Sequence, residues 1–169
     1  QIGTGTKLSS VDKLFTSGSV QVTGNELDFM IEGDGFFRVQ RDDGEILYTR
    51  AGNLNKDNTG RLVTPDGYPL VPEIKVPTGA KDLHVGQDGS VTVQMSGKTQ
   101  DIGQILIADF INPAGLISIG GNYYTTSRSS GDPVVDVPSQ NGLGRVSQTQ
   151  LESSNVNIVE EMVNMISAQ

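Results

Sequence analysis

The sequence has no cysteine, no tryptophan and a single histidine, so several kinds of site are excluded at once. Without cysteine, neither a disulfide framework nor a thiolate metal centre can form. A Ser-His-Asp triad could be assembled only around His84, and no Gly-x-Ser-x-Gly elbow is present. His84 lies between Leu83 and Val85 in a strand pattern. We therefore expect it to face solvent from a strand, and the sequence argues against an enzyme.

Basic residues are also scarce, with 12 Lys and Arg against 20 Asp and Glu and a net charge of −8. Binding to nucleic acid or to an anionic membrane needs clustered basic side chains, and there is no such cluster. No apolar run approaches the roughly 18 residues of a membrane span, and no signal-peptide pattern opens the chain. The first residue is not Met and an apolar pattern is still running at Gln169. We expect a fragment from which native terminal segments have been removed.

Glycine is abundant, at 21 of 169 residues, whereas aromatic residues make up only 5%. A chain of this length is sufficient for one domain that buries about 70% of its unfolded surface. Many glycines and few aromatics favour slender strands joined by tight turns over a helical bundle. The predicted fold is mainly β: a single compact domain of short antiparallel strands and hairpins.

The segment from Leu27 to Leu70 alternates β-prone runs with turn signals. Gly33 and Gly35 allow the chain to reverse between strands at 27–31 and 36–39, since glycine tolerates positive φ. Asp43-Gly44 predicts a type I′ hairpin, and Pro65-Asp66-Gly67 and Asp88-Gly89 repeat the signal. Because four aspartates directly precede glycine, turn chemistry explains them more simply than an acid/base pair does.

The rest of the chain continues the strand pattern with one long interruption. The run 105–111 is the most continuously apolar and is predicted to occupy the sheet centre. The run 68–77 carries three prolines and is predicted to be an edge strand or a strap. Further strands are expected at 19–23, 83–85, 90–95, 116–119, 123–126 and, weakly, 145–152, with a long polar loop at 129–144.

Two blocks of sequence strongly resemble the bacterial flagellar rod and hook protein family. The first includes Gly33-Asp34-Gly35-Phe36-Phe37, Tyr48-Thr49-Arg50-Ala51-Gly52-Asn53 and Asp66-Gly67-Tyr68. The second runs from Leu151-Glu152-Ser153-Ser154-Asn155 to Met165-Ile166. Hook proteins of this family carry additional domains between the two blocks. Here only about 80 residues separate them, which one modest β domain uses up, so a rod protein fits better than a hook protein. By overall resemblance, the distal rod subunit fits better than the proximal ones.

From Asn157 the apolar spacing changes to that of a short C-terminal helix, with Asn157 as cap and Glu160 three residues later. Its apolar face packs either on this domain or on a neighbouring chain. We single out Val159, Met162, Val163 and Ile166 as candidate assembly residues. The predicted organisation is an extended N-terminal segment with one strand at 1–26, a β-rich core at 27–152 and the start of the helix at 153–169. A disordered terminus is the alternative for 1–10.

The resemblance implies a structural subunit of the flagellar rod. Such a subunit polymerises helically, transmits torque, and is exported by the flagellar apparatus without a cleaved signal peptide to the periplasmic part of the basal body. Its implied partners are copies of itself, other rod proteins, the hook protein and the surrounding ring proteins. No nucleic acid, small-molecule substrate or cofactor is implied. Without the terminal helices, we expect this chain to be monomeric.

Two alternatives depend on particular residues. A secreted ligand- or carbohydrate-binding module would need aromatic platforms, for which only tyrosines are available: Tyr48, Tyr68, Tyr123 and Tyr124. A calcium loop is suggested by Asn55, Asp57, Thr59, Gly60 and Asp66, whose spacing matches the first, third, fifth, sixth and twelfth loop positions. The twelfth residue is Asp rather than Glu and strands flank the loop, so a plain turn is the simpler interpretation.

Overall fold

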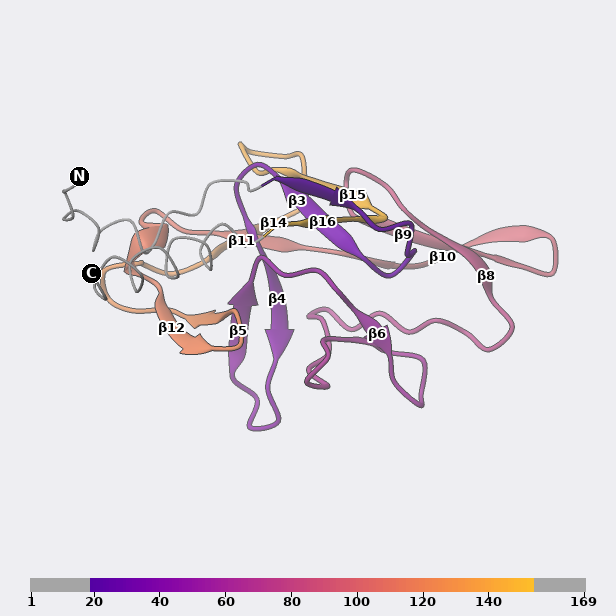
Figure 1. Ribbon diagram of the computed structural model, residues 1–169, viewed down its shortest axis with the longest axis horizontal. Helices are drawn as coiled ribbons and strands as arrows, with labels where there is room; N and C mark the ends of the chain where they lie inside the picture. The colour runs from indigo at the N-terminus through magenta and orange to yellow at the C-terminus, as the bar shows by residue number, and fades with distance from the viewer. Residues whose placement is uncertain (1–18, 154–169) are drawn as a thin grey trace, which may run out of the picture.

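The computed structural model describes residues 19–153 and shows an elongated, mainly β molecule (Figure 1). Its strands pair antiparallel, as the sequence predicts. The strands are β2 (Val20–Val22), β3 (Phe29–Glu32), β4 (Phe36–Gln40), β5 (Ile46–Thr49), β6 (Asn55–Lys56), β7 (Leu62–Val63), β8 (Lys81–Val85), β9 (Ser90–Met95), β10 (Lys98–Gln104), β11 (Ile107–Asp109), β12 (Ile117–Gly120), β13 (Tyr123–Thr125), β14 (Val134–Asp136), β15 (Arg145–Gln148) and β16 (Gln150–Glu152). A short 3-10 turn, η1 (Pro113–Gly115), joins β11 to β12.

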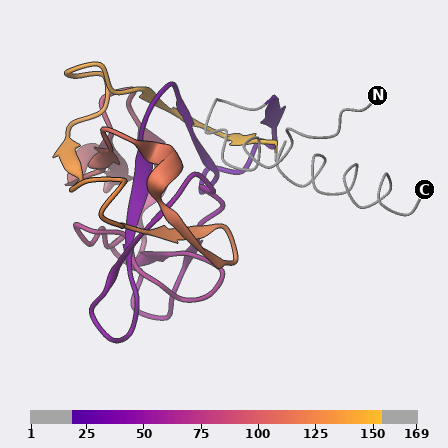
Figure 2. The same ribbon diagram turned by 90° about the vertical axis from the view of Figure 1, so that its left-hand side faces the viewer.

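Most of these strands belong to a six-stranded sheet in the order β12-β13-β5-β4-β11-β14 and a three-stranded sheet in the order β10-β9-β8. The remaining strands form the two-stranded pairs β15-β3, β16-β2 and β6-β7. The three-stranded sheet lies at one end of the long axis and β12 lies at the other (Figure 1). The β4–β5 hairpin projects from the body in both views (Figure 2).

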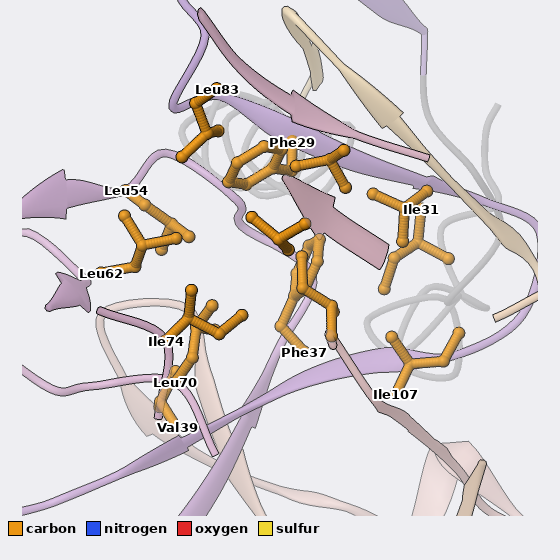
Figure 3. Close-up of a cluster of buried hydrophobic side chains, with 14 of the residues drawn as sticks. Phe29, Ile31, Phe37, Val39, Leu54, Leu62, Leu70, Ile74, Leu83 and Ile107 are labelled. Atoms are coloured by element: carbon orange, nitrogen blue, oxygen red, sulfur yellow. The ribbon is translucent and has the colours of Figure 1, made fainter. Parts of the chain in front are cut away.

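The main hydrophobic core fills the space between the sheets and the β3–β15 pair. Phe29, Ile31, Phe37 and Ile107 have at most 1% of their surface exposed, and Val91 of the three-stranded sheet has none (Figure 3). One continuous cluster therefore joins residues from both sheets. This cluster fits the predicted single core, although the molecule is elongated.

A second, smaller cluster covers the opposite face of the six-stranded sheet. Phe36, Tyr48 and Ala108 follow or precede residues of the main core by one position, so alternation along each strand turns them to the other face. The Tyr48 and Phe110 rings meet edge to face, with centroids 5.0 Å apart. Because both faces are covered, these strands read as apolar runs without alternation.

Four hairpin loops share one turn geometry, which differs from the predicted type I′ turn. At Asp43-Gly44, the Gly44 N–H donates to the Arg41 carbonyl at 2.8 Å and the Arg41 N–H donates to the Glu45 carbonyl at 2.8 Å. Gly44 alone has positive φ, at 91°, which defines a type I turn followed by a bulged glycine. The same pairs of hydrogen bonds recur at 57–61, 64–68 and 86–90.

The glycine-rich segment after β3 forms a corner rather than a hairpin. Gly33 and Gly35 have φ of 114° and 131°, so the predicted positive φ is confirmed. However, β3 pairs with β15, whereas β4 pairs with β5 and β11. The expected reversal instead passes the chain from one pair of strands into the six-stranded sheet.

Other strand predictions need smaller corrections. The run 105–111 contributes only three residues to β11, which lies between β4 and β14 rather than at the sheet centre, and Ile111 is 90% exposed. The predicted loop 129–144 contains the edge strand β14. The predicted strand 145–152 is split into β15 and β16 by Thr149, which has a φ of 65°. Strand β10 was not predicted, because its sequence is polar and largely exposed.

The segment 68–77 forms no named strand, but its backbone pairs along the edge of β4, where the Gln40 N–H donates to the Pro69 carbonyl at 3.0 Å, as the edge-strand alternative predicts. Isolated bridges join Leu70 to Val39 and Lys75 to Arg61. Strand β2 confirms the strand expected at 19–23. The predicted C-terminal helix lies outside the described residues, so the fold prediction is confirmed only for its β part.

Gly52, in the first family-like block, occupies a position where the fold leaves no room for a side chain. A Cβ atom built there would lie 2.0 Å from the Phe29 carbonyl oxygen. The backbone of Phe29 is held at this position, because its N–H donates to the Gly52 carbonyl at 2.9 Å. We expect Gly52→Ala to lower the free energy of unfolding by about 3 kcal/mol, because backbone cannot move aside as a side chain can.

Gly97 provides the matched control, since a Cβ there meets no atom within 4 Å although φ is 78°. Gly97→Ala should cost only the left-handed strain of about 1 kcal/mol. Urea unfolding of both variants makes the comparison, and equal losses would contradict the steric argument.

Candidate assembly junction

The first and last described strands lie side by side. β2 pairs with β16, with Val22 opposite Gln150 and Val20 opposite Glu152. The Ser153 N–H then donates to the Ser19 carbonyl at 2.7 Å. The two ends of the described chain therefore leave the body at one place, next to each other. We call the paired strands β2 and β16 the terminal ribbon.

Arg50 joins the terminal ribbon to the body. Its Nε donates to Oε1 of Glu152 at 3.0 Å, and one Nη2 hydrogen reaches Oε2 of Glu152 at 3.3 Å. The other Nη2 hydrogen is donated to the Ile31 carbonyl at 3.1 Å, and Nη1 donates to the carbonyls of Gly33 and Gly35 at 2.8 and 2.7 Å. The five N–H donors of the guanidinium thus have five acceptor contacts.

This ion pair is largely removed from water. The side chains of Arg50 and Glu152 are only 14% and 11% exposed. Two charges at such a site are tolerated only when both are paired and hydrogen-bonded, which is the case here. Arg50 follows β5 and Glu152 ends β16, so one side chain connects the six-stranded sheet, the β3–β4 corner and the terminal ribbon.

A backbone bend sets the direction in which the ribbon leaves. Thr149, between β15 and β16, is left-handed at φ 65°, which is unusual for a β-branched residue. Its carbonyl accepts the N–H groups of Thr23 at 2.9 Å and Gly24 at 3.3 Å, and its N–H donates to the Asp28 carbonyl at 2.8 Å. Because three backbone hydrogen bonds hold Thr149, the bend is a fixed feature of the fold.

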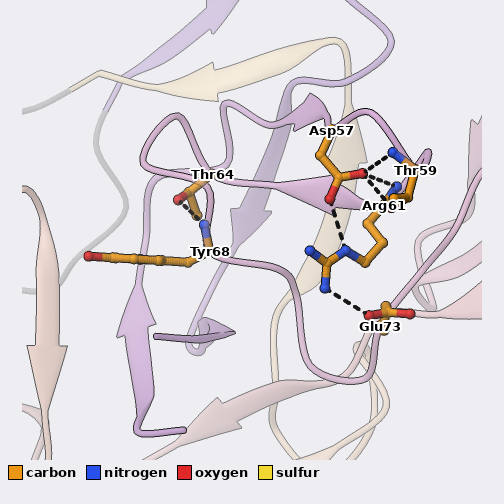
Figure 4. Close-up of polar contacts among 6 residues, drawn as sticks. All are labelled: Asp57, Thr59, Arg61, Thr64, Tyr68 and Glu73. Atoms are coloured by element: carbon orange, nitrogen blue, oxygen red, sulfur yellow. Dashed lines mark hydrogen bonds and ion pairs between the residues drawn. The ribbon is translucent and has the colours of Figure 1, made fainter. Parts of the chain in front are cut away.

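The two carboxylates of the possible calcium loop, Asp57 and Asp66, have other partners. Asp57 Oδ1 accepts from the Thr59 N–H and hydroxyl and from the Arg61 N–H, and Oδ2 accepts from Arg61 Nε at 2.9 Å (Figure 4). The Thr59 side-chain hydrogen bond is the main reason why the pKa of Asp57 is lowered. Asp66 instead binds Tyr123. Within residues 19–153, no three His, Asp or Glu side chains are grouped to hold a metal ion.

The tyrosines do not offer the flat exposed platform that a carbohydrate site would use. Tyr48 and Tyr123 are 5% and 7% exposed, while Tyr68 and Tyr124 are partly buried against the two hydrophobic clusters. The Tyr123 hydroxyl donates to Asp66 Oδ2 at 2.7 Å and lies 2.8 Å from the Thr64 hydroxyl, which can donate to it. These rings therefore pack in or against the two hydrophobic clusters.

Of the two remaining predicted sites, only His84 lies in the described part of the chain. His84 is exposed on β8, as expected for a strand residue that faces solvent. The candidate assembly residues Val159, Met162, Val163 and Ile166 lie outside the described residues. In the part of the chain that is described, no helix has the length and apolarity needed to cross a membrane.

Comparison with known proteins matches the chain at both of its sequence blocks. Residues 30–93 match the family model for the flagellar hook protein FlgE/F/G D1 domain, and residues 147–169 match that for the flagellar basal body rod FlgEFG protein C-terminal region. The chain belongs to the flagellar hook and basal-body rod protein family. The recognised blocks meet in space at Arg50 and Glu152.

Several relatives that align over the whole chain share one name. Flagellar basal-body rod protein FlgG of Buchnera aphidicola from Schizaphis graminum is 43% identical, and that of Bacillus subtilis is 44% identical; each alignment covers 100% of this chain and 66% of the relative. The rod protein FlgF of Caulobacter vibrioides is 32% identical over 95% of this chain and 63% of its own length. The chain thus spans 66% of the length of the FlgG proteins that it matches here.

Arg50 and Glu152 stand inside the two family-like blocks, but the sequence alone indicates no role for either residue. Their partners are backbone carbonyls and a carboxylate 102 positions away, which no local pattern reveals. The one available signal was that Arg50 and Glu152 stand inside the two family-like blocks.

We expect Arg50→Lys to lower the free energy of unfolding by about 3 kcal/mol although it keeps the charge, because an ammonium cannot serve three carbonyls and a carboxylate in one plane. Arg61→Lys is the matched control, since Arg61 pairs with Asp57 and Glu73 at a site where its side chain is 36% exposed. That change should cost less than about 1 kcal/mol. Urea unfolding of both variants measures the difference, and equal losses would argue against a special role for Arg50.

Alkaline pH should weaken the fold through Tyr123. Burial raises the pKa of Tyr123 to about 12, and the neighbouring Asp66 carboxylate acts in the same direction. The folded state holds this proton more tightly than the unfolded chain, whose tyrosines titrate near about 10. The contribution is therefore fully present below about pH 10 and is lost as the pH rises towards about 12. Unfolding free energies between pH 8 and 11 should fall less steeply for Tyr123→Phe than for the parent chain; parallel profiles would contradict this.

Proposed function

We propose that this chain is the body of a structural subunit of the bacterial flagellar rod, in its distal part. The observation that carries the proposal is the meeting of the two family blocks at the buried Arg50–Glu152 pair, next to which the two ends of the described chain lie side by side. The higher identity to FlgG than to the FlgF relative favours the distal subunit over a proximal one. The role is structural rather than enzymatic.

The geometry of the junction suits a shaft that transmits torque. In the proposed assembly, the terminal segments drive polymerisation and leave the body side by side. They can hold the body firmly only if the junction between them and the body resists bending. Arg50 connects the terminal ribbon to the β3–β4 corner, and three backbone hydrogen bonds hold the bend at Thr149. We further propose that Val159, Met162, Val163 and Ile166 form part of the assembly interface, because they recur at helical spacing among the apolar residues of the segment that follows the ribbon.

The six-stranded sheet offers two open edges for contacts between copies. Within the described residues, β12 pairs only with β13 and β14 pairs only with β11. β12 exposes Ile117 and Ile119 at 47% and 41%, and β14 exposes Val134 at 64%. If the β12 edge of one copy meets the β14 edge of the next, the contact is head-to-tail. Repeated head-to-tail contacts build a filament when the rotation between neighbouring copies does not close into a ring.

The proposed partners follow from this role. They are copies of the same subunit, the other rod proteins, the hook protein and the surrounding ring proteins, at the periplasmic rod of the basal body. Export by the flagellar secretion apparatus without a cleaved signal peptide is part of the proposal. A carbohydrate-binding module is not favoured, because the four tyrosines face the two cores.

The chain itself is expected to remain monomeric at all concentrations, whereas the protein with the terminal segments of its FlgG relatives should form rod-like filaments. The physical reason is that the apolar terminal segments supply most of the assembly energy. Sizing and electron microscopy provide the measurement. Filaments of this chain alone, or a longer protein unable to self-associate, would contradict the proposed function.

An edge variant in the longer protein tests the sheet contact separately. Ile117→Lys should shorten or abolish filaments, because it replaces an exposed apolar side chain of β12 with a charged one, whereas Ser118→Lys adds the charge without removing an apolar contact. Ser118→Lys, on the same exposed strand, is the matched control. If both variants assemble like the parent, the open edge does not carry the contact.

A further inference from the structure

Strands β8 and β15 lie next to each other but form no regular ladder. A single backbone hydrogen bond joins their neighbourhoods, from the Val146 N–H to the Gln87 carbonyl at 3.1 Å. Two residues further along β15 is Gln148, and two residues back along the chain from Gln87 is Val85 of β8. These are the residues that an antiparallel pairing would place opposite each other.

The Gln148 side chain occupies that missing rung. Its Oε1 accepts the Val85 N–H at 3.1 Å, and its Nε2 donates to the Leu83 carbonyl at 2.8 Å and to the Glu26 carbonyl at 2.9 Å. A carbonyl can only accept and a backbone N–H can only donate, so the orientation of the amide is fixed by its partners. The side-chain amide thus acts as a backbone peptide would in the ladder.

Backbone pairing cannot continue at this point because both strands turn away. Thr149 is left-handed, which bends the chain from β15 into the terminal ribbon. On the other strand, Asp82 has a φ of 51° and the register of β8 shifts between Lys81 and His84. The Gln148 side chain spans the gap that these two irregularities open.

We propose that Gln148 is a positioning residue that couples the orientation of the three-stranded sheet to the terminal ribbon. It stands next to the bend at Thr149 on one side and hydrogen-bonds the edge strand β8 on the other. Packing of Leu83 and Val85 in the core attaches the three-stranded sheet, but apolar packing has no direction. The directional amide contacts fix the angle. The mechanical meaning of this coupling rests on the proposed function, whereas the coupling itself is a property of this chain.

The test replaces Gln148 with Met, which keeps the length of the side chain and cannot hydrogen-bond. Amide hydrogen exchange of Val85 should accelerate by roughly tenfold or more in Gln148→Met, because its acceptor is lost. Exchange of Val93 in β9 should change little. Gln94→Met is the matched control, since the Gln94 amide donates only within the hairpin, to the Thr99 hydroxyl at 2.8 Å.

A second measurement reports orientation. The chain has no cysteine, so spin labels can be placed at Gln21→Cys on the ribbon and Lys98→Cys on β10 without background. The distribution of distances between the labels should broaden in Gln148→Met and stay narrow in Gln94→Met, at temperatures where both remain folded.

Two results would overturn the proposal. One is an unchanged distance distribution in Gln148→Met. The other is acceleration of exchange at Val85 and Val93 alike, which would show a general loss of stability. Neither result depends on whether the protein assembles, so failure here is distinguishable from failure of the rod assignment.

Discussion

The buried contact between Arg50 and Glu152 is the interaction on which the architecture depends, because it brings together parts of the chain that no strand pairing joins. β5, the β3–β4 corner and β16 meet at one guanidinium. Charge-assisted hydrogen bonds are stronger than neutral ones, and a bidentate pair also fixes direction. An apolar contact at the same place could hold the ribbon but would leave its angle free.

The glycines of the corner make this contact possible. The carbonyls of Gly33 and Gly35 both point at Arg50, which requires the chain to turn twice within three residues. Positive φ at both positions provides those turns, and a side chain at Gly35 would also meet Ile107 at 2.8 Å. The Gly-Asp-Gly sequence is therefore explained by the arginine site rather than by a hairpin. This is why its turn signal, read alone, predicts the wrong connection.

The features that the sequence predicted correctly are those that are determined by a few neighbouring residues. Asp-Gly and Pro-Asp-Gly turns mark hairpins because backbone conformation is set within four residues, and the exposed position of His84 follows from alternation along β8. The sequence could not reveal β10, whose polar residues pair without entering the core, nor the roles of Arg50 and Gln148. Their partners are backbone atoms of distant segments, which carry no residue-specific signature. Family resemblance located the important blocks but not the contact between them.

The two long-range polar contacts act on the same short length of chain. Gln148 ends β15 and holds the three-stranded sheet, while Glu152 ends β16 and holds the six-stranded sheet through Arg50. Only the bend at Thr149 and the strand β16 separate them. Any rotation of the terminal ribbon must therefore move both sheets together or break hydrogen bonds at one of these side chains. In the proposed rod function, torque that enters at the ribbon would reach both sheets through these directional hydrogen bonds as well as through packing in the hydrophobic core.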